Sequence, residues 1–108
     1  MAIFEDREKG FEQKYKHDQE LEFKIKVRAN KILGLWVAGE FGLPTAEAEE
    51  YAKSVVAADL ERPGDDDVVE KVLADFKGRG LDMTEHRLRL RMAETLKVAR
   101  EQVMSEKA

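Results

Sequence analysis

The chain has 108 residues, of which 43% are hydrophobic and 39% are charged, well above the usual quarter. This length suits one domain, and the net charge of -4 argues against general attraction to nucleic acid or to a membrane surface. The absence of cysteine excludes disulfides and fits a reducing compartment. The sequence opens without a basic and then apolar leader, and its central apolar run is shorter than the roughly 20 residues that span a bilayer. We therefore expect a cytoplasmic protein with no direct membrane insertion.

Residues 1–18 form a charged segment with few large apolar side chains, which bury too little surface to offset their ordering entropy. Phe4, Phe11 and Tyr15 nevertheless follow one another at +7 and +4, the spacing of one helical stripe. Gly10 weakens such a helix by about 1 kcal/mol relative to alanine. We expect a flexible arm over residues 1–18 that becomes helical against a partner groove. A terminus with incidental aromatic residues is the alternative.

The densest apolar stretch surrounds Trp36, and its spacing predicts a helix over about residues 19–41. One face of this helix has five apolar members: Leu21, Ile25, Ala29, Ile32 and Trp36. Leu33, Leu35 and Val37 fall off that face, so the middle of the helix is apolar all round and should be enclosed by the rest of the chain. The pair Gly34 and Ala38 predicts a close approach by another helix. Gly42 should cap the helix, and Pro44 prevents its continuation.

Three shorter helices are predicted after Pro44. The first covers about residues 46–60, with Thr45 as its N-cap. The second runs from the acidic triplet at 65–67 to Gly78 and Gly80, with Asp67 and Glu70 at capping-box spacing. The third begins near Thr84, which caps it together with or in place of Asp82, and frays after residue 103. The apolar face of the first consists of Ala48, Tyr51 or Ala52, Val55 and Ala58 or Asp59. That of the second consists of Val68, Val69, Val72, Leu73 and Phe76. That of the third consists of Leu88, Met92, Leu96, Ala99 and Val103.

The loops between these helices are short, which favours antiparallel neighbours. The predicted fold is all-α: a small four-helix bundle over residues 19–105, with the flexible N-terminal arm in front of it.

The sequence contains no recognisable catalytic constellation. Its two serines have no nucleophile-elbow setting, and no phosphate-binding loop occurs. The acidic triplet at 65–67 lacks the pattern of a calcium loop and stands at a helix start, where acids are expected. The two histidines lie far apart and have no metal-ligand spacing. We therefore predict no enzyme activity, no cofactor and no metal. His17, next to Asp18, is a candidate pH-sensitive group, with an exposed histidine in a mobile arm as the simpler interpretation.

The basic side chains offer one further alternative, a nucleic-acid-binding helical module. It would use Lys24, Lys26, Arg28, Lys31 and the cluster Arg87, Arg89 and Arg91. On a helix these arginines spread around the cylinder instead of forming one patch, and the helices before them are rich in acids. Salt bridges within the bundle are therefore favoured, and we expect no nucleic-acid partner.

Two stretches resemble a known family. They are Phe4-x-Asp6-Arg7-Glu8-x-x-Phe11-Glu12-x-Lys14-Tyr15-x-His17-Asp18 and Arg28-Ala29-Asn30-Lys31-Ile32-Leu33-Gly34-Leu35-Trp36. Together with Tyr51-Ala52-x-x-Val55-Val56-x-Ala58-Asp59 and the last helix, they are similar to the zeta subunit of alphaproteobacterial F-type ATP synthases. Two residues depart from the family pattern: Gly10 stands where alanine is expected, and Lys16 where a small residue is expected.

The resemblance implies a four-helix protein that inhibits ATP hydrolysis by the catalytic head of the synthase. In this family the arm folds into an αβ interface, approaches the central stalk and blocks rotation in the hydrolytic direction. The implied partners are the alpha, beta and gamma subunits, which would hold the protein in the cytoplasm, peripheral to the inner membrane. Phe4, Phe11 and Tyr15 would anchor the arm, while Arg7, Glu8, Glu12 and Lys14 would orient it by charge. A generic helical-bundle interaction module is the alternative function.

Overall fold

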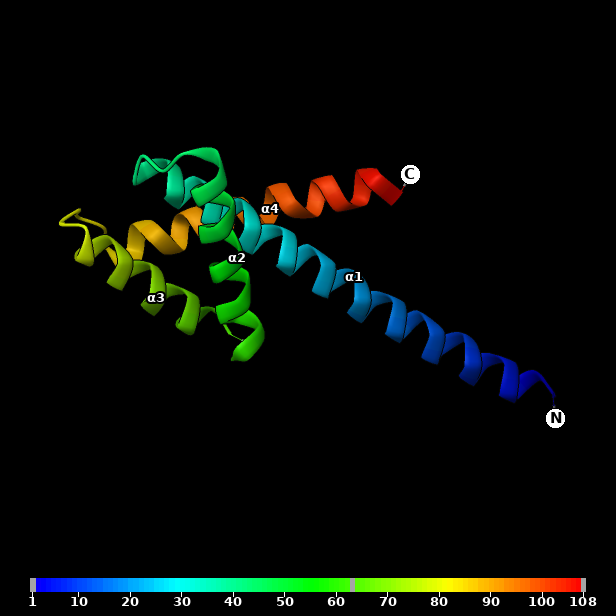
Figure 1. Cartoon of the computed structure of the whole chain (residues 1–108). Helices are drawn as coiled ribbons and strands as arrows, with labels where there is room; N and C mark the ends of the chain where they lie inside the picture. Colours follow the sequence, from blue (N-terminus) through cyan, green and yellow to red (C-terminus); the bar gives the residue numbers. More distant parts are fainter. Residues whose placement is uncertain (1, 63, 108) are drawn as a thin grey trace.

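The computed structural model describes the backbone of residues 2–62 and 64–107 and the side chains of residues 17–62 and 64–106. The described residues form four helices and no strand, which confirms the all-α four-helix prediction. The helices are α1 (Ala2–Glu40), α2 (Thr45–Glu61), α3 (Asp65–Gly78) and α4 (Glu85–Lys107). Helix α1 packs mainly against α2 and α4, and α3 returns beside α2 (Figure 1).

Helix α1 begins at Ala2, not near residue 19 as the sequence suggested. The helical backbone crosses the expected boundary between arm and bundle without a break. The physical reason is that the sequence has no proline between residues 10 and 20, and one glycine costs a helix only about 1 kcal/mol. The predicted flexibility of the arm, residues 1–18, falls mostly on residues whose side chains lie outside the described part, and it stays a prediction. Side chains 17–20 are exposed, and Ile25 is the first that is fully buried.

Two helix ends follow the predicted glycine caps. Gly42 has φ +72°, and the Leu43 N–H donates to the Ala38 carbonyl at 3.0 Å, a Schellman motif that closes α1. Gly80 has φ +70°, and the Leu81 N–H donates to the Phe76 carbonyl at 3.0 Å, so the same motif closes α3. A left-handed conformation favours glycine because it has no Cβ.

The start of α3 at the acidic triplet is as predicted, whereas the predicted N-caps were right at one position and wrong at two. Thr84 accepts a hydrogen bond from the Arg87 N–H at 3.1 Å and caps α4. Thr45, however, is the first helical residue of α2 after Pro44, and α3 starts at Asp65 after Gly64, so Thr45 and Asp67 are not N-caps. Neither helix has a side-chain cap. The acids at 65–67 occupy the first turn of α3 instead, where they favour the positive end of the helix dipole.

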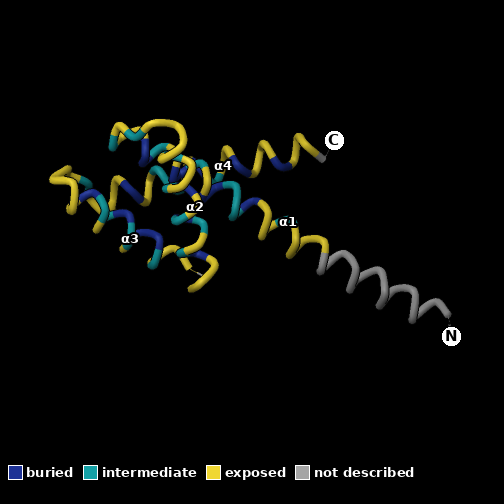
Figure 2. The backbone as a smooth tube through the Cα atoms, in the orientation of Figure 1, coloured by how far each residue is buried: buried dark blue, intermediate teal, exposed yellow. Residues whose placement is uncertain are grey.

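The apolar core has two parts. Figure 2 shows buried positions, in dark blue, along the four helices. The large cluster uses all four helices and consists of Leu33, Val37, Val55, Val68, Val69, Val72, Phe76 and Leu88. The small cluster joins only α1 and α4 and consists of Ile25, Ala29, Ala99 and Val103. The helix faces predicted from spacing supply most of these residues, because burial in a bundle follows the 3.6-residue period.

The middle of α1 is less enclosed than predicted. Leu33 and Val37 are buried, but Leu35 is 38% exposed and Trp36 is only half-buried at the edge of the large cluster. Helix α1 packs mainly against two helices, α2 and α4, so one of its faces stays open. The Arg91 guanidinium covers the Trp36 ring at 4.4 Å from its centroid, a cation–π contact.

Gly34 explains how closely α2 approaches α1. A Cβ added at Gly34 would lie 2.6 Å from the Cα of Ala52, a backbone atom that cannot give way without moving the helix. This contact confirms the prediction from the pair of small residues on α1.

A polar network closes the other edge of the large cluster. The half-buried Tyr51 hydroxyl donates to Asp75 at 2.8 Å, and the Lys71 ammonium contacts the same carboxylate at 2.9 Å. The Tyr51 ring packs edge-on against Phe41, with the centroids 5.5 Å apart. Burial, together with the hydrogen bond to Asp75, raises the pKa of the Tyr51 hydroxyl. The network therefore keeps this tyrosine protonated while it joins α2 to α3.

Candidate partner-binding surface

The predicted partner-binding residues lie on the first turns of α1. Their side chains are outside the described residues: Phe4, Arg7, Glu8, Phe11, Glu12, Lys14 and Tyr15. His17 is the first described side chain of α1, and it is exposed. Its suggested pH sensitivity stays a prediction.

The buried apolar contacts of the part of α1 that follows these residues are with α4. Leu21 and Ile25 pack toward Ala99 and Val103. This contact is a narrow seam, because only two helices supply it and alanine is one of its main members. The start of the bundle is therefore thin where the arm joins it.

Two ion pairs flank this seam. The Arg28 guanidinium contacts Glu106 through two nitrogens, at 2.8 and 3.0 Å, and Arg100 contacts Glu22 in the same way at 2.8 and 3.2 Å. These bonds lower the pKa of the Glu22 and Glu106 carboxyls. Both pairs are solvent-exposed, so each stabilises the seam only weakly but fixes the register of α1 on α4.

The basic residues considered for nucleic acid mostly have acidic partners inside the bundle. Arg89 of α4 contacts Asp66 of α3 at 2.7 Å, as the sequence predicted for this cluster. Lys26 pairs with Asp65, while Arg91 contacts Glu94 at 3.1 Å and covers Trp36. Their charges are neutralised locally, which argues against a phosphate-binding surface.

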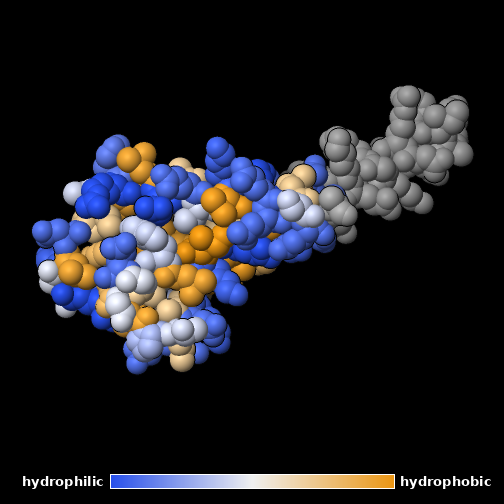
Figure 3. Space-filling view, turned by 90° about the horizontal axis from the view of Figure 1, so that it is seen from above, coloured by the Kyte–Doolittle hydropathy of each residue, from blue (hydrophilic) through white to orange (hydrophobic). Residues whose placement is uncertain are grey.

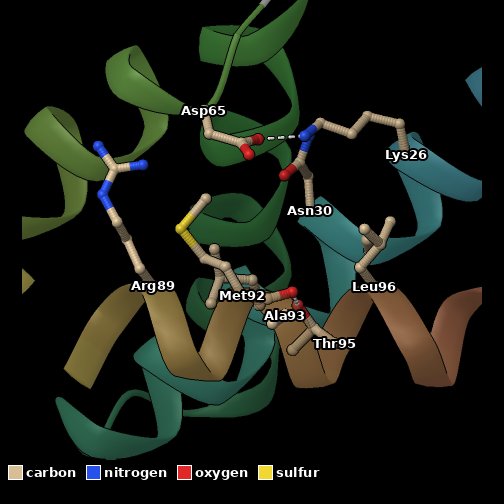
Figure 4. A pocket seen from close by; sticks show the side chains of 10 residues that line it. Lys26, Asn30, Asp65, Arg89, Met92, Ala93, Thr95 and Leu96 are labelled. Atoms are coloured by element: carbon tan, nitrogen blue, oxygen red, sulfur yellow. Dashed lines mark hydrogen bonds and ion pairs between the residues drawn. The ribbon is translucent and has the colours of Figure 1, made fainter. Parts of the chain in front are cut away.

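A pocket lies between α1, α3 and α4 (Figure 4). Lys26 and Asp65 close one side of it, and Met92 and Leu96 of α4 line the opposite side. Its volume is about 190 Å³. Asn30 lines it, is 4% exposed, and its side-chain nitrogen has no hydrogen-bond partner in the described part of the molecule.

A larger open cleft of about 490 Å³ lies on α1 just beyond the arm. Phe23 and Lys26 line it from α1, Asp59 and Leu60 from α2, and Leu96 from α4. Sequence patterns did not predict this cleft. Asp59 appeared only as an alternative member of an apolar stripe, and that oddity, an acid at a buried position, was the one available signal.

The described residues contain no group of three or more histidine, cysteine or acidic side chains placed to hold a metal ion. Within the same part of the chain, no helix combines the length and the apolar character that crossing a bilayer requires.

Comparison with known proteins decides the family. The sequence model of the family described as ATPase inhibitor subunit zeta matches residues 1–102. The chain belongs to this zeta family. The match includes the whole predicted arm as well as the bundle.

A solved structure is similar to this chain in fold and in sequence. It is described only as a solution NMR structure, and it superimposes with a TM-score of 0.70 at 41% sequence identity. The alignment covers 80% of this chain and 98% of the other. No curated protein matches the chain.

Membership of the zeta family gives the chain a regulatory role as an ATPase inhibitor subunit that associates with ATP synthase, and such a role is non-catalytic. The expected resemblance is thus confirmed at the level of the family.

Proposed function

We propose that this zeta-family protein inhibits ATP hydrolysis by inserting its arm into an αβ interface of the F-type catalytic head, where the arm blocks rotation of the gamma subunit. The observation that carries the proposal is the family match across residues 1–102, which includes the arm. The protein would then be cytoplasmic and peripheral to the inner membrane through the synthase.

The length of the arm suits a wedge. Residues 2–18 of an α-helix span about 25 Å at 1.5 Å per residue. The bundle begins near Leu21, where α1 packs on α4, and involves all four helices farther along α1, so it would remain outside the interface and limit the depth of insertion.

The spacing of the arm residues suits one interface. At 100° per residue, positions 4, 7, 8, 11, 12, 14 and 15 fall within an arc of about 160°. Phe4, Phe11 and Tyr15 occupy the middle of this arc, and charged residues occupy both sides. Aromatic anchors within a charged rim are typical of an interface whose centre supplies the binding energy.

The continuity of α1 supports a mechanical role. One helix runs from Ala2 to Glu40, so the arm joins the bundle without a loop. A force on the arm would therefore pass directly into the α1–α4 seam.

Inhibition of ATP hydrolysis by the cognate catalytic head tests the proposal. The wild-type protein should slow hydrolysis, and the double variant Phe11→Ala/Tyr15→Ala should lose more than tenfold in inhibitory potency, because two interface anchors each contribute at least 1 kcal/mol or so. Gln13→Ala is the matched control, since position 13 lies opposite the aromatic stripe. Full inhibition by the double variant would show that the arm is not the inhibitory element.

A further inference from the structure

The cleft beyond the arm contains an unpaired buried acid. Asp59 is 9% exposed, and its Oδ1 atom has no hydrogen-bond partner among the described residues. A buried carboxylate oxygen without a donor is costly, since it has lost water and gained nothing in exchange.

The other charges of the cleft are already paired. Lys26 contacts Asp65, and Glu22 accepts from Arg100. Neither Lys26 nor Arg100 contacts Asp59 in the structure. The cleft therefore has one unmet requirement, a hydrogen-bond donor that preferably carries positive charge.

The rim of the cleft is apolar and open. Phe23 of α1 is 58% exposed, and Leu60 of α2 is 52% exposed. Figure 3 shows one face of the molecule, on which apolar surface gathers near the middle with polar surface around it. Isolated exposed apolar side chains are ordinary, but two of them beside an unpaired buried acid form a more specific surface.

We propose that this cleft binds a basic side chain, lysine or arginine, that projects from the catalytic head of the ATPase. The chemistry identifies the occupant. A long basic side chain can lay its methylene groups on Leu60, place its cationic end against Asp59, and pack on the Phe23 ring. The inference rests on the proposed function, to which it adds a second contact.

The position of the cleft supports the same partner. Phe23 stands only five residues after the end of the predicted arm, on the same helix. A surface that receives the arm would therefore lie close to the cleft as well. The bundle then would be held at the entrance of the interface by its own contact instead of hanging from the arm alone.

Two full-length variants and two controls test this inference against the cognate head. Phe23→Ala and Asp59→Asn should each weaken inhibition about tenfold, as loss of a central interface residue does. Leu90→Ala is the matched apolar control, because Leu90 is 54% exposed and does not line the cleft. Asp82→Asn is the acidic control, because Asp82 is exposed and lies elsewhere. Both controls should inhibit within twofold of wild type.

The thermal midpoint of each variant, measured by circular dichroism, separates binding from folding. A variant is compared at a temperature where it is fully folded. If both cleft variants inhibit like wild type while Phe11→Ala/Tyr15→Ala does not, the cleft contact is refuted and the inhibitory function stands. If the wild-type protein itself does not inhibit the head, both proposals fall.

A photocrosslink identifies the occupant. The variant Phe23→p-benzoylphenylalanine is illuminated in the complex with the head. Its photoreactive side chain should form a crosslink to a head peptide that contains lysine or arginine. A crosslink only to a second copy of this chain, or only to head peptides without a basic residue, would refute the inference.

Discussion

The two clusters of the core differ in how many helices build them. The large cluster draws on all four helices and includes Leu33, Phe76 and Leu88, whereas the small cluster joins α1 to α4 with Ile25, Ala29, Ala99 and Val103. Both clusters contain fully buried valines. A buried valine in the large cluster is therefore surrounded by residues from four helices, whereas Val103 in the small cluster is surrounded by residues from two.

This difference indicates where the molecule can open. Local opening costs least where few apolar contacts hold an element, so the α1–α4 seam is expected to open before the large cluster. The seam is also where the arm enters the bundle. A stable cluster at one end of α1 and a seam that opens more easily beside the arm would suit the proposed insertion of the arm into a partner.

The largest expected effect comes from adding a methyl group where α1 and α2 approach most closely. Gly34→Ala should lower the free energy of unfolding by about 3 kcal/mol, because its Cβ would meet the Ala52 backbone where α1 and α2 pack together. Gly39→Ala is the control, since nothing lies within 4 Å of its added Cβ, and it should be neutral or stabilising. Chemical denaturation measures both. Equal stability of the two variants would contradict the close approach of α2.

A pair of identical truncations compares the clusters directly. Val72→Ala in the large cluster should cost about 2 kcal/mol, from two lost methyl groups and the cavity they leave. Val103→Ala in the small cluster should cost less, because a two-helix seam can close over the gap. Equilibrium unfolding gives both values. A larger loss at Val103 would reverse the ranking of the two clusters.

Removing one hydroxyl tests the polar edge of the large cluster. Tyr51→Phe should cost about 1 kcal/mol, since it leaves Asp75 with only Lys71 as a partner. The loss should appear in the stability of α2 and α3 and not in hydrogen exchange at the α1–α4 seam. A change confined to the seam would show that the two clusters do not behave independently.

Acid should produce the smallest effect, at the seam. The pKa values of Glu22 and Glu106 are lowered in the folded chain, so their ion pairs stabilise it above the unfolded pKa of about 4.3, and this contribution is lost as pH falls through the lowered values. The protection factors of the Ala99 and Val103 amides, which are exchange rates corrected for the intrinsic pH dependence of amide exchange, should fall more between pH 6 and pH 3 than that of Val72.

The double variant Glu22→Gln/Glu106→Gln provides the control for the acid experiment. The Ala99 and Val103 amides of this variant should have lower protection factors at pH 6, and these factors should change less toward pH 3. A seam with the same acid response in wild type and variant would assign that response to other carboxyls.

Much of the fold could be predicted because helical burial repeats every 3.6 residues. The faces with Val55, Val72 and Val103 and the glycine stops at Gly42 and Gly80 follow from spacing and from local backbone geometry. The acidic triplet marked the start of α3 correctly, but the capping residues were less predictable. Thr45 and Asp67 have capping residue types, yet both lie inside their helices, which begin at Thr45 and at Asp65.

The degree to which Trp36 is buried also could not be predicted from spacing. The apolar run around it predicted an enclosed helix, yet Trp36 is half-buried and Leu35 is partly exposed. Hydropathy gives the amount of apolar surface, whereas the directions of the neighbouring helices decide which part of it is covered. The unpaired acid Asp59 and the cleft around it depend on the same directions.

By itself the sequence determined the helical period, the stops, the family and the aromatic stripe of the arm, because each is local or is written as a pattern. The tertiary structure alone decided the uneven distribution of the core, the seam beside the arm and the cleft at Asp59. These depend on which residues far apart in the chain meet, and packing in three dimensions, not sequence spacing, sets those meetings.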